Sequence, residues 1–252
     1  MTVTTFQQSY AALRKQIIDF AMPVDTDQWQ SQTDVPMTLT RELQFIRFDV
    51  DVPEDIVAWQ DDCQPNLPWA EDHFEERVSG YAWNPPPSAA YWPFAQKDHE
   101  DHTSDDGRFS HTYPERLWPY GDNPAGTPVS WTAIDESGDL TDLVRLLQDH
   151  RHTRQAFIPI WWPCDGKMAG ALRVPCTIGY HFMIRDDYIH CHYFMRSCDM
   201  LRHLRDDIYM AGRLMQWVAS QLPHTRCGQL VMSCTSMHVF EGDMQLFRAG
   251  LQ

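Results

Sequence analysis

The feature that most constrains the fold of this chain is a predicted β-hairpin in its second half. Residues 176–184 and 188–195 are rich in aromatic and β-branched residues, and the polar segment Arg185-Asp186-Asp187 separates them. This composition on both sides of a short polar segment is typical of two antiparallel strands joined by a turn. In such a hairpin the start of the first strand lies beside the end of the second. We therefore expect Cys176 and Arg196 to be close in space.

Hydrophobic periodicity predicts further elements around this hairpin. Phe6, Tyr10, Leu13 and Ile17 have the spacing of one face of a helix, which we expect over residues 5–21. Other helices are expected from Pro53, from Pro68, over 139–150 and over 206–222, and other strands over 41–52, 155–162 and 228–240. This order indicates an α+β fold, in which a mixed, mostly antiparallel sheet packs with helices. A chain of 252 residues can bury a full core, so we expect one domain over residues 1–252.

Residues 84–128 are rich in Pro, Asp, His, Gly and Trp, and they predict long loops over a surface or a site. Within them, residues 97–107 are expected to be the most mobile. His99, His102 and His111 lie near aspartates, but their spacing is not that of a metal site, so we expect no metal.

The charge and cysteine content limit the partners and the compartment. The net charge is −15 without a basic tract, which argues against a nucleic-acid polymer as partner but allows a small anionic ligand. Seven cysteines without framework spacing indicate free thiols. No apolar run has the length of a membrane span or the form of a signal peptide. We expect a cytoplasmic protein that is not bound to a membrane.

Five separated motifs, in the same order along the chain, resemble the thymidylate synthase superfamily. They are Thr153-Arg154-Gln155-Ala156, Arg173-Val174-Pro175-Cys176-Thr177, Arg196-Ser197-Cys198-Asp199, the pair Asp207 and Tyr209, and Ser236-Met237-His238-Val239-Phe240. Within the superfamily, Arg196-Ser197-Cys198-Asp199 with Arg205-Asp206-Asp207 is most similar to phage deoxycytidylate (dCMP) hydroxymethylases. The resemblance implies a single thymidylate-synthase-like domain, a nucleotide monophosphate as substrate, 5,10-methylenetetrahydrofolate as cofactor and a homodimer formed through the sheet.

The resemblance identifies Cys176 as the nucleophile. C5 of a pyrimidine reacts only after a thiolate adds at C6, so this chemistry needs one activated cysteine that faces the ring. Arg196 matches an arginine that binds the nucleotide phosphate and favours the thiolate, and Ser197 would donate to the same phosphate. Without the surrounding motifs, a buried inert cysteine would be the commoner reading.

Arg154 matches an arginine that reaches the phosphate held by the other subunit, which implies a twofold dimer with shared sites. Many relatives carry a second arginine where this chain has Gln155. One cation is therefore missing, and a neighbour such as Arg151 could contribute.

Asp207 stands where synthases acting on uracil carry asparagine. A carboxylate accepts from the exocyclic N4–H₂ of cytosine, whereas it faces uracil O4 with a second acceptor. A mismatched buried pair costs about 1–3 kcal/mol, so the aspartate favours cytosine. The alternative is that Asp206 and Asp207 only cap the following helix.

The remaining site residues also follow from the resemblance. Asp199 matches the aspartate that binds the folate pterin, and His203 replaces the usual glycine nearby. His238 matches a histidine that contacts the sugar, while its usual tyrosine partner is Phe240 in this chain.

A general acid/base is also required, and relatives use a glutamate on an early helix, three residues before an aromatic. Glu71 has that spacing from Phe74, Glu76 is the second candidate, and Glu75 is expected to be solvated. Tyr113 resembles a tyrosine that orders water at the active site.

The sequence therefore predicts a folate-dependent dCMP 5-hydroxymethylase. The short C-terminal tail after His238 fits a hydroxymethylase, in which water is the second nucleophile. The alternatives are methyl transfer to deoxyuridylate (dUMP) or dCMP, a dUMP hydroxymethylase, and a non-catalytic relative that binds nucleotide.

Overall fold

The computed structural model describes residues 4–26, 39–93, 107–125, 138–169 and 173–250. Of the segment 97–107, which was expected to be the most mobile, all but Gly107 lies outside these ranges, as do His99 and His102. Among the described residues, no helix is both long and apolar enough to cross a bilayer.

A six-stranded sheet forms the centre of the molecule, with strand order β1-β2-β6-β5-β4-β3. The strands are β1 (Met22–Asp25), β2 (Leu39–Asp51), β3 (Phe157–Pro159), β4 (Thr177–Arg185), β5 (Tyr188–Asp199) and β6 (Arg226–Phe240). All neighbouring strands are antiparallel except β5 and β6, which run parallel. The predicted hairpin is the β4–β5 pair, in which Thr177 lies opposite Met195. The α+β class and the mostly antiparallel sheet are confirmed.

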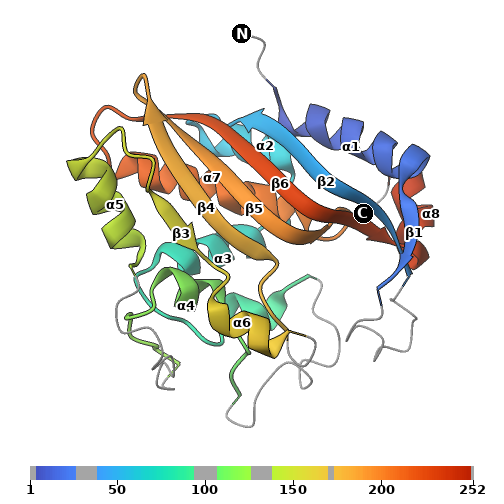
Figure 1. The fold of residues 1–252 in the computed structure, drawn as a ribbon, viewed down its shortest axis with the longest axis horizontal. Helices are drawn as coiled ribbons and strands as arrows, with labels where there is room; N and C mark the ends of the chain where they lie inside the picture. Colours follow the sequence, from blue (N-terminus) through green and yellow to red (C-terminus); the bar gives the residue numbers. More distant parts are fainter. Residues whose placement is uncertain (1–3, 27–38, 94–106, 126–137, 170–172, 251–252) are drawn as a thin grey trace.

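Helices cover one face of this sheet, and none of the helices formed by the described residues lies over the opposite face in Figure 1. The α-helices are α1 (Phe6–Phe20), α2 (Ile56–Cys63), α3 (Trp69–Val78), α4 (Tyr113–Leu117), α5 (Leu140–Asp149), α6 (Pro163–Met168), α7 (Leu204–Ser220) and α8 (Met244–Ala249). Short 3₁₀ helices span Pro87–Tyr91 and Glu241–Asp243. The core lies between the sheet and α7, whose residues are mostly buried.

Local sequence explains where the helices begin. Thr5 caps α1 with a capping box that includes Gln8, and Asp139 caps α5 in the same way with Asp142. The helices expected over 5–21, 139–150 and 206–222 are present with small shifts at their ends. The helix expected from Pro53 begins later, after the cap Asp55, because the Asp55 carboxylate accepts from the backbone N–H of Ala58.

The structure differs from the predicted secondary structure in three ways. The strand expected over 155–162 is only Phe157–Pro159, because Pro159 lacks an N–H for the ladder and Pro163 begins α6. Strand β1 and helices α6 and α8 were not predicted. Residues 84–128, expected as loops, contain α4 and the 3₁₀ helix Pro87–Tyr91.

The face of the sheet without helices carries aromatic and imidazole rings. The Phe157 ring lies 6.3 Å from that of His181 and 6.4 Å from that of Phe194, and Phe194 stacks on His192 at 3.9 Å. Phe157 is 43 % exposed, which leaves a large apolar side chain in contact with solvent in the single chain. We call these four residues the sheet-face cluster.

Candidate active site

A cavity of about 670 Å³ lies at the carboxyl ends of β5 and β6 and the amino end of α7. Because β5 and β6 are parallel, their carboxyl ends reach the same edge of the sheet. Seven of the residues selected from the sequence line this cavity. They are Tyr113, Cys176, Arg196, Ser197, Asp199, Asp207 and His238.

Cys176 and Arg196 are neighbours across the β4–β5 hairpin, as the sequence predicted. The Arg196 backbone N–H donates to the Cys176 carbonyl at 2.9 Å, and Arg196 Nη2 lies 3.7 Å from Cys176 Sγ. The guanidinium is held in place because Nε donates to the Pro175 carbonyl at 2.9 Å. All seven cysteines are free, and only Cys164 and Cys176 among them are not buried. A positive charge beside an accessible sulfur is the arrangement that favours a thiolate nucleophile.

Tyr113 reaches the cavity at the start of α4. Its hydroxyl lies 3.0 Å from Thr177 Oγ1, which lies 2.9 Å from the Tyr193 hydroxyl, so three hydroxyls form a chain behind Cys176. The Arg77 guanidinium lies over the Tyr113 ring, 4.0 Å from its centre. Burial raises the pKa of Tyr113 to about 12, so it is a neutral hydroxyl at neutral pH.

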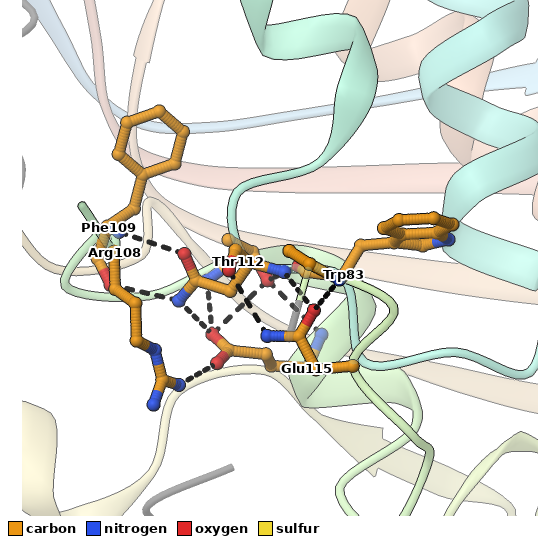
Figure 2. A network of polar contacts seen from close by, with 8 residues as sticks. Trp83, Arg108, Phe109, Thr112 and Glu115 are labelled. Atoms are coloured by element: carbon orange, nitrogen blue, oxygen red, sulfur yellow. Dashed lines mark hydrogen bonds and ion pairs between the residues drawn. The ribbon is translucent and has the colours of Figure 1, made fainter. Parts of the chain in front are cut away.

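The segment that presents Tyr113 is held by a buried carboxylate, Glu115, which is 0 % exposed. Figure 2 shows the network around it. Glu115 forms an ion pair with Arg108 and accepts from Asn84 Nδ2 at 2.8 Å and from the Thr112 backbone N–H at 3.1 Å. This part of residues 84–128, which was expected to form only loops, is therefore held in place by the Glu115 carboxylate, whose buried charge has an ion-pair partner and hydrogen-bond donors.

Asp207 projects from the first turn of α7 into the cavity. Removal from bulk water raises the pKa of its carboxyl to about 7, although the nearby Arg77 charge acts in the opposite direction. The Cys198 thiol lies 3.7 Å from Asp207 Oδ2. Asp206, by contrast, is occupied by Asn66, which donates to it through both its backbone and its side chain at 2.8 Å. Both aspartates line the cavity, but Asp206 also fixes the loop between α2 and α3 through Asn66.

Asp199 lies at the end of β5 and is 5 % exposed. Its Oδ1 accepts from the backbone N–H groups of Leu201 and Arg202, while its buried Oδ2 has no hydrogen-bond partner among the described residues. Burial raises the pKa of Asp199 to about 7. The His203 ring stacks on Trp92 at 5.6 Å along the same wall. Arg202 Nε forms an ion pair with this Oδ2 at 3.8 Å, which is longer than a hydrogen bond. The oxygen can therefore still accept N–H donors of a bound heterocycle.

His238 and Phe240 lie side by side on the cavity wall. Their rings meet edge to face at 5.4 Å, and the Arg202 guanidinium lies over Phe240 at 5.2 Å from its centre. Burial lowers the pKa of His238, so its imidazole is neutral at neutral pH. The position expected to carry a tyrosine therefore offers an apolar surface and no hydroxyl.

Two residues selected from the sequence lie outside the cavity lining. Glu71 faces α7, where its carboxylate forms an ion pair with Arg213 at 2.6 Å and accepts from the Tyr209 hydroxyl. Arg154 is exposed beyond the cavity, and its carbonyl accepts from His181 of the sheet-face cluster at 3.0 Å. The structure does not bring either residue to Cys176 in the single chain.

Sequence reasoning missed three residues of α3 that line the cavity, Trp69, His73 and Arg77. They are spaced four apart, so they form one stripe of the helix. That spacing is the signal in the sequence that places the three residues on one face. Within the described ranges, no group of three or more His, Cys, Asp or Glu side chains is placed to hold a metal ion.

Fold and site together define an α+β protein whose accessible cysteine, paired with an arginine, opens into a cavity walled by carboxylates and aromatic rings. The sequence model of the thymidylate synthase family matches residues 79–252, which is more than half of the chain. The chain belongs to the thymidylate synthase family. Members of this family transfer a one-carbon unit to C5 of a pyrimidine nucleotide and use methylenetetrahydrofolate.

Proposed function

We propose that this chain is a dCMP 5-hydroxymethylase that works through a covalent bond between Cys176 and C6 of the base. The observation that carries the proposal is the cavity itself, which brings Cys176, Arg196 and Asp207 together. The family supplies the reaction class, and Asp207 supports the choice of cytosine.

The nucleophilic step uses groups on the cavity wall. The Cys176 thiolate adds to C6, the electrons of the C5=C6 bond move towards C4, and C5 becomes nucleophilic. Arg196 Nη1 is not bonded to any described residue, whereas Nε and Nη2 are held by backbone carbonyls, so this nitrogen remains available for a phosphate oxygen. Ser197 also lines the cavity, and in this proposal its hydroxyl donates to the same phosphate.

The base is selected by Asp207 in this proposal. When ionised, its carboxylate accepts from N4–H₂ of cytosine, and the neutral form can donate to O4 of uracil. Because the pKa of Asp207 is about 7, both forms exist near neutral pH. That pKa favours dUMP as the second candidate substrate.

Methylenetetrahydrofolate, when bound, supplies the carbon at the oxidation level of formaldehyde. Asp199 would hold its pterin through Oδ2, and the wall that contains Trp92 and His203 would lie against the cofactor. Tyr113, at the end of its chain of hydroxyls, is suited to hold water near C5. Addition of water to the methylene carbon on C5, followed by loss of the Cys176 thiolate, would give the hydroxymethyl product.

The proposal includes a homodimer formed through the face of the sheet that carries no helices. The sheet-face cluster supplies apolar and imidazole rings for such an interface, and Arg154 is exposed beside it. In a twofold dimer, each chain would offer Arg154 to the phosphate site of its partner.

The test is incubation of the protein with dCMP, dUMP or CMP and methylenetetrahydrofolate, followed by product masses. The expected product is dCMP with one added formaldehyde unit, together with tetrahydrofolate. A methylated product together with dihydrofolate would show that the protein transfers a methyl group and not a hydroxymethyl group. Nucleotide binding in calorimetry without exchange of the C5 hydrogen would instead support the non-catalytic reading.

A further inference from the structure

The residues of α3 that line the cavity include a histidine, whereas none of Glu71, Glu75 and Glu76 lines it; Glu76 lies behind His73. His73 lines the cavity between Trp69 and Arg77, and its ring stacks on Trp69 at 5.2 Å with an interplanar angle of 18°. The carboxylate of Glu71, two residues earlier, accepts hydrogen bonds from Arg213 and Tyr209. Glu75 is 64 % exposed at its side chain. Thus His73 is the proton-transfer group that this helix offers to the cavity.

A fixed pair of residues determines which nitrogen of His73 carries the proton. Nδ1 lies 3.1 Å from Glu76 Oε2 and 3.0 Å from Ser88 Oγ. Ser88 donates its hydroxyl to Glu76 Oε2 at 2.5 Å and its backbone N–H to Oε1 at 2.6 Å. Since the Ser88 proton is directed at the carboxylate, Nδ1 must be the donor to this pair. The lone pair of Nε2 then remains on the side of the ring away from Glu76.

The surroundings keep this imidazole neutral. Burial, followed by the charge of Arg77, lowers the pKa of His73 to about 4, and Glu76 acts in the opposite direction. These are the two charged groups of α3 that face His73, while the 3₁₀ helix Pro87–Tyr91 contributes the hydroxyl of Ser88. Burial makes this ring a weaker base than a free imidazole, so proton uptake at the free Nε2 depends on the Glu76 carboxylate beside Nδ1, which raises the pKa and stabilises the imidazolium that forms.

We infer that His73, oriented by Glu76 and Ser88, is the general base for water in this cavity, in the place where relatives use a glutamate. This inference rests on the proposed function. Glu76, which the sequence suggested as a second acid/base, becomes a positioning residue that acts through His73.

In the reaction, His73 would act when water adds to the methylene carbon on C5. The water oxygen bonds to that carbon, its proton moves to Nε2, and the electrons of the exocyclic C=C bond move into the ring. Those electrons then re-form C5=C6 and expel the Cys176 thiolate, while Nε2 returns its proton to solvent. No oxidant or reductant is needed for this step.

The same group serves a reaction that needs no cofactor. In D₂O, thiolate addition at C6 lets C5 take up a deuteron. Water hydrogen-bonded to His73 Nε2 then removes the original proton, and elimination of the thiolate restores the ring. The C5–H exchange of dCMP therefore reports on His73 without methylenetetrahydrofolate.

The experiment compares His73→Asn, which can keep the bond from the Nδ1 position to Glu76, with His73→Ala and with Glu71→Gln. His150→Gln, on an exposed histidine at the end of α5, is the matched control. We expect both His73 variants to lose about 100-fold or more in C5–H exchange and in product formation, as for loss of a general base. Binding of dCMP in calorimetry should change little, because His73 is not assigned to phosphate or base recognition.

Chemical rescue distinguishes a base from a structural residue. Added imidazole should restore C5–H exchange to His73→Ala, and substituted imidazoles of similar size should restore it in the order of their pKa values. Rescue that is independent of basicity, or full activity of His73→Asn, would overturn the inference. Loss of exchange in Glu71→Gln with retention in His73→Asn would return the role to Glu71. If the unaltered protein shows no exchange or transfer with any pyrimidine nucleotide, the proposed function fails, and this inference fails with it.

Discussion

At the scale of single residues, the site is defined by groups that the fold removes from water at a cost in stability. Asp199 and Asp207 are carboxyls whose pKa values are raised to about 7, mainly by burial. In an unfolded chain an aspartate has a pKa of about 3.9. The folded protein therefore binds protons at these two positions between about pH 4 and pH 7, where the unfolded chain releases them.

The sign of the resulting pH dependence follows directly. A raised folded-state pKa favours folding most below the unfolded pKa, and this contribution is lost as the pH rises to about 7. We expect Asp207→Asn to stabilise the protein more at pH 8 than at pH 4. The change in the free energy of unfolding should be about 2–4 kcal/mol larger at pH 8. Urea titrations at the two pH values measure the difference, and an equal effect at both would contradict burial of the charged form.

The same substitution should change base preference. Asp207→Asn replaces an acceptor pair by one donor and one acceptor, so we expect the ratio of kcat/KM for dCMP over dUMP to fall about tenfold or more. Competition between the two nucleotides with mass detection gives this ratio. Asp206→Asn is the control, because Asp206 is bonded to Asn66 and should alter stability without altering the ratio.

In the unaltered protein the preference should depend on pH. Above pH 7 the ionised Asp207 favours the N4–H₂ group of cytosine, and below pH 7 its neutral form can donate to uracil O4. We expect discrimination in favour of dCMP to strengthen from pH 6 to pH 8. If the ratio of kcat/KM for dCMP over dUMP does not change over this range, a residue other than Asp207 selects the base.

At the scale of elements, α4 depends on the buried Glu115. Removing one member of a buried ion pair leaves an uncompensated charge, which typically costs about 3–5 kcal/mol. Glu115→Ala should lower the free energy of unfolding by that amount and reduce activity, because α4 carries Tyr113. The double variant Glu115→Ala/Arg108→Met should recover part of the stability in denaturant titration. No recovery would mean that the bonds to Asn84 and Thr112 dominate.

Much of the fold could be predicted because its elements follow local rules. The hairpin turn at Asp186 and Asp187, both at positive φ, and the capping boxes of α1 and α5 are readable from a few neighbouring residues. The pairing of β5 with β6 is different: it depends on a crossover through α7, and no local pattern in either strand specifies it.

The candidate site divides in the same way. Cys176 and Arg196 are linked by a hairpin, so their proximity could be predicted from register alone. The orientation of α3 could not, because Glu71 and His73 lie on different faces of one short helix. Which face meets the cavity is decided by the packing of Trp69 and Arg77 and by the ion pair between Glu71 and Arg213.

At the scale of the whole molecule, the proposed dimer makes complementation possible. Cys176→Ala removes the nucleophile, and Arg154→Ala removes the arginine offered to the partner. When the two inactive variants are mixed in equal amounts and exchange subunits, half of the dimers are mixed, and one site in each is intact. We expect about one quarter of full activity to return. No recovery after verified subunit exchange would place Arg154 outside the site.

The two buried carboxylates also bear on how long the protein lasts in a cell. A ligand that binds only the folded form raises the free energy of unfolding in proportion to the logarithm of its concentration. A nucleotide whose amino group meets Asp207, or a heterocycle whose N–H groups meet Asp199, would offset the cost of those charges. Degradation should therefore be fastest when the supply of pyrimidine nucleotide is low, so that the abundance of the catalyst follows the abundance of its substrate.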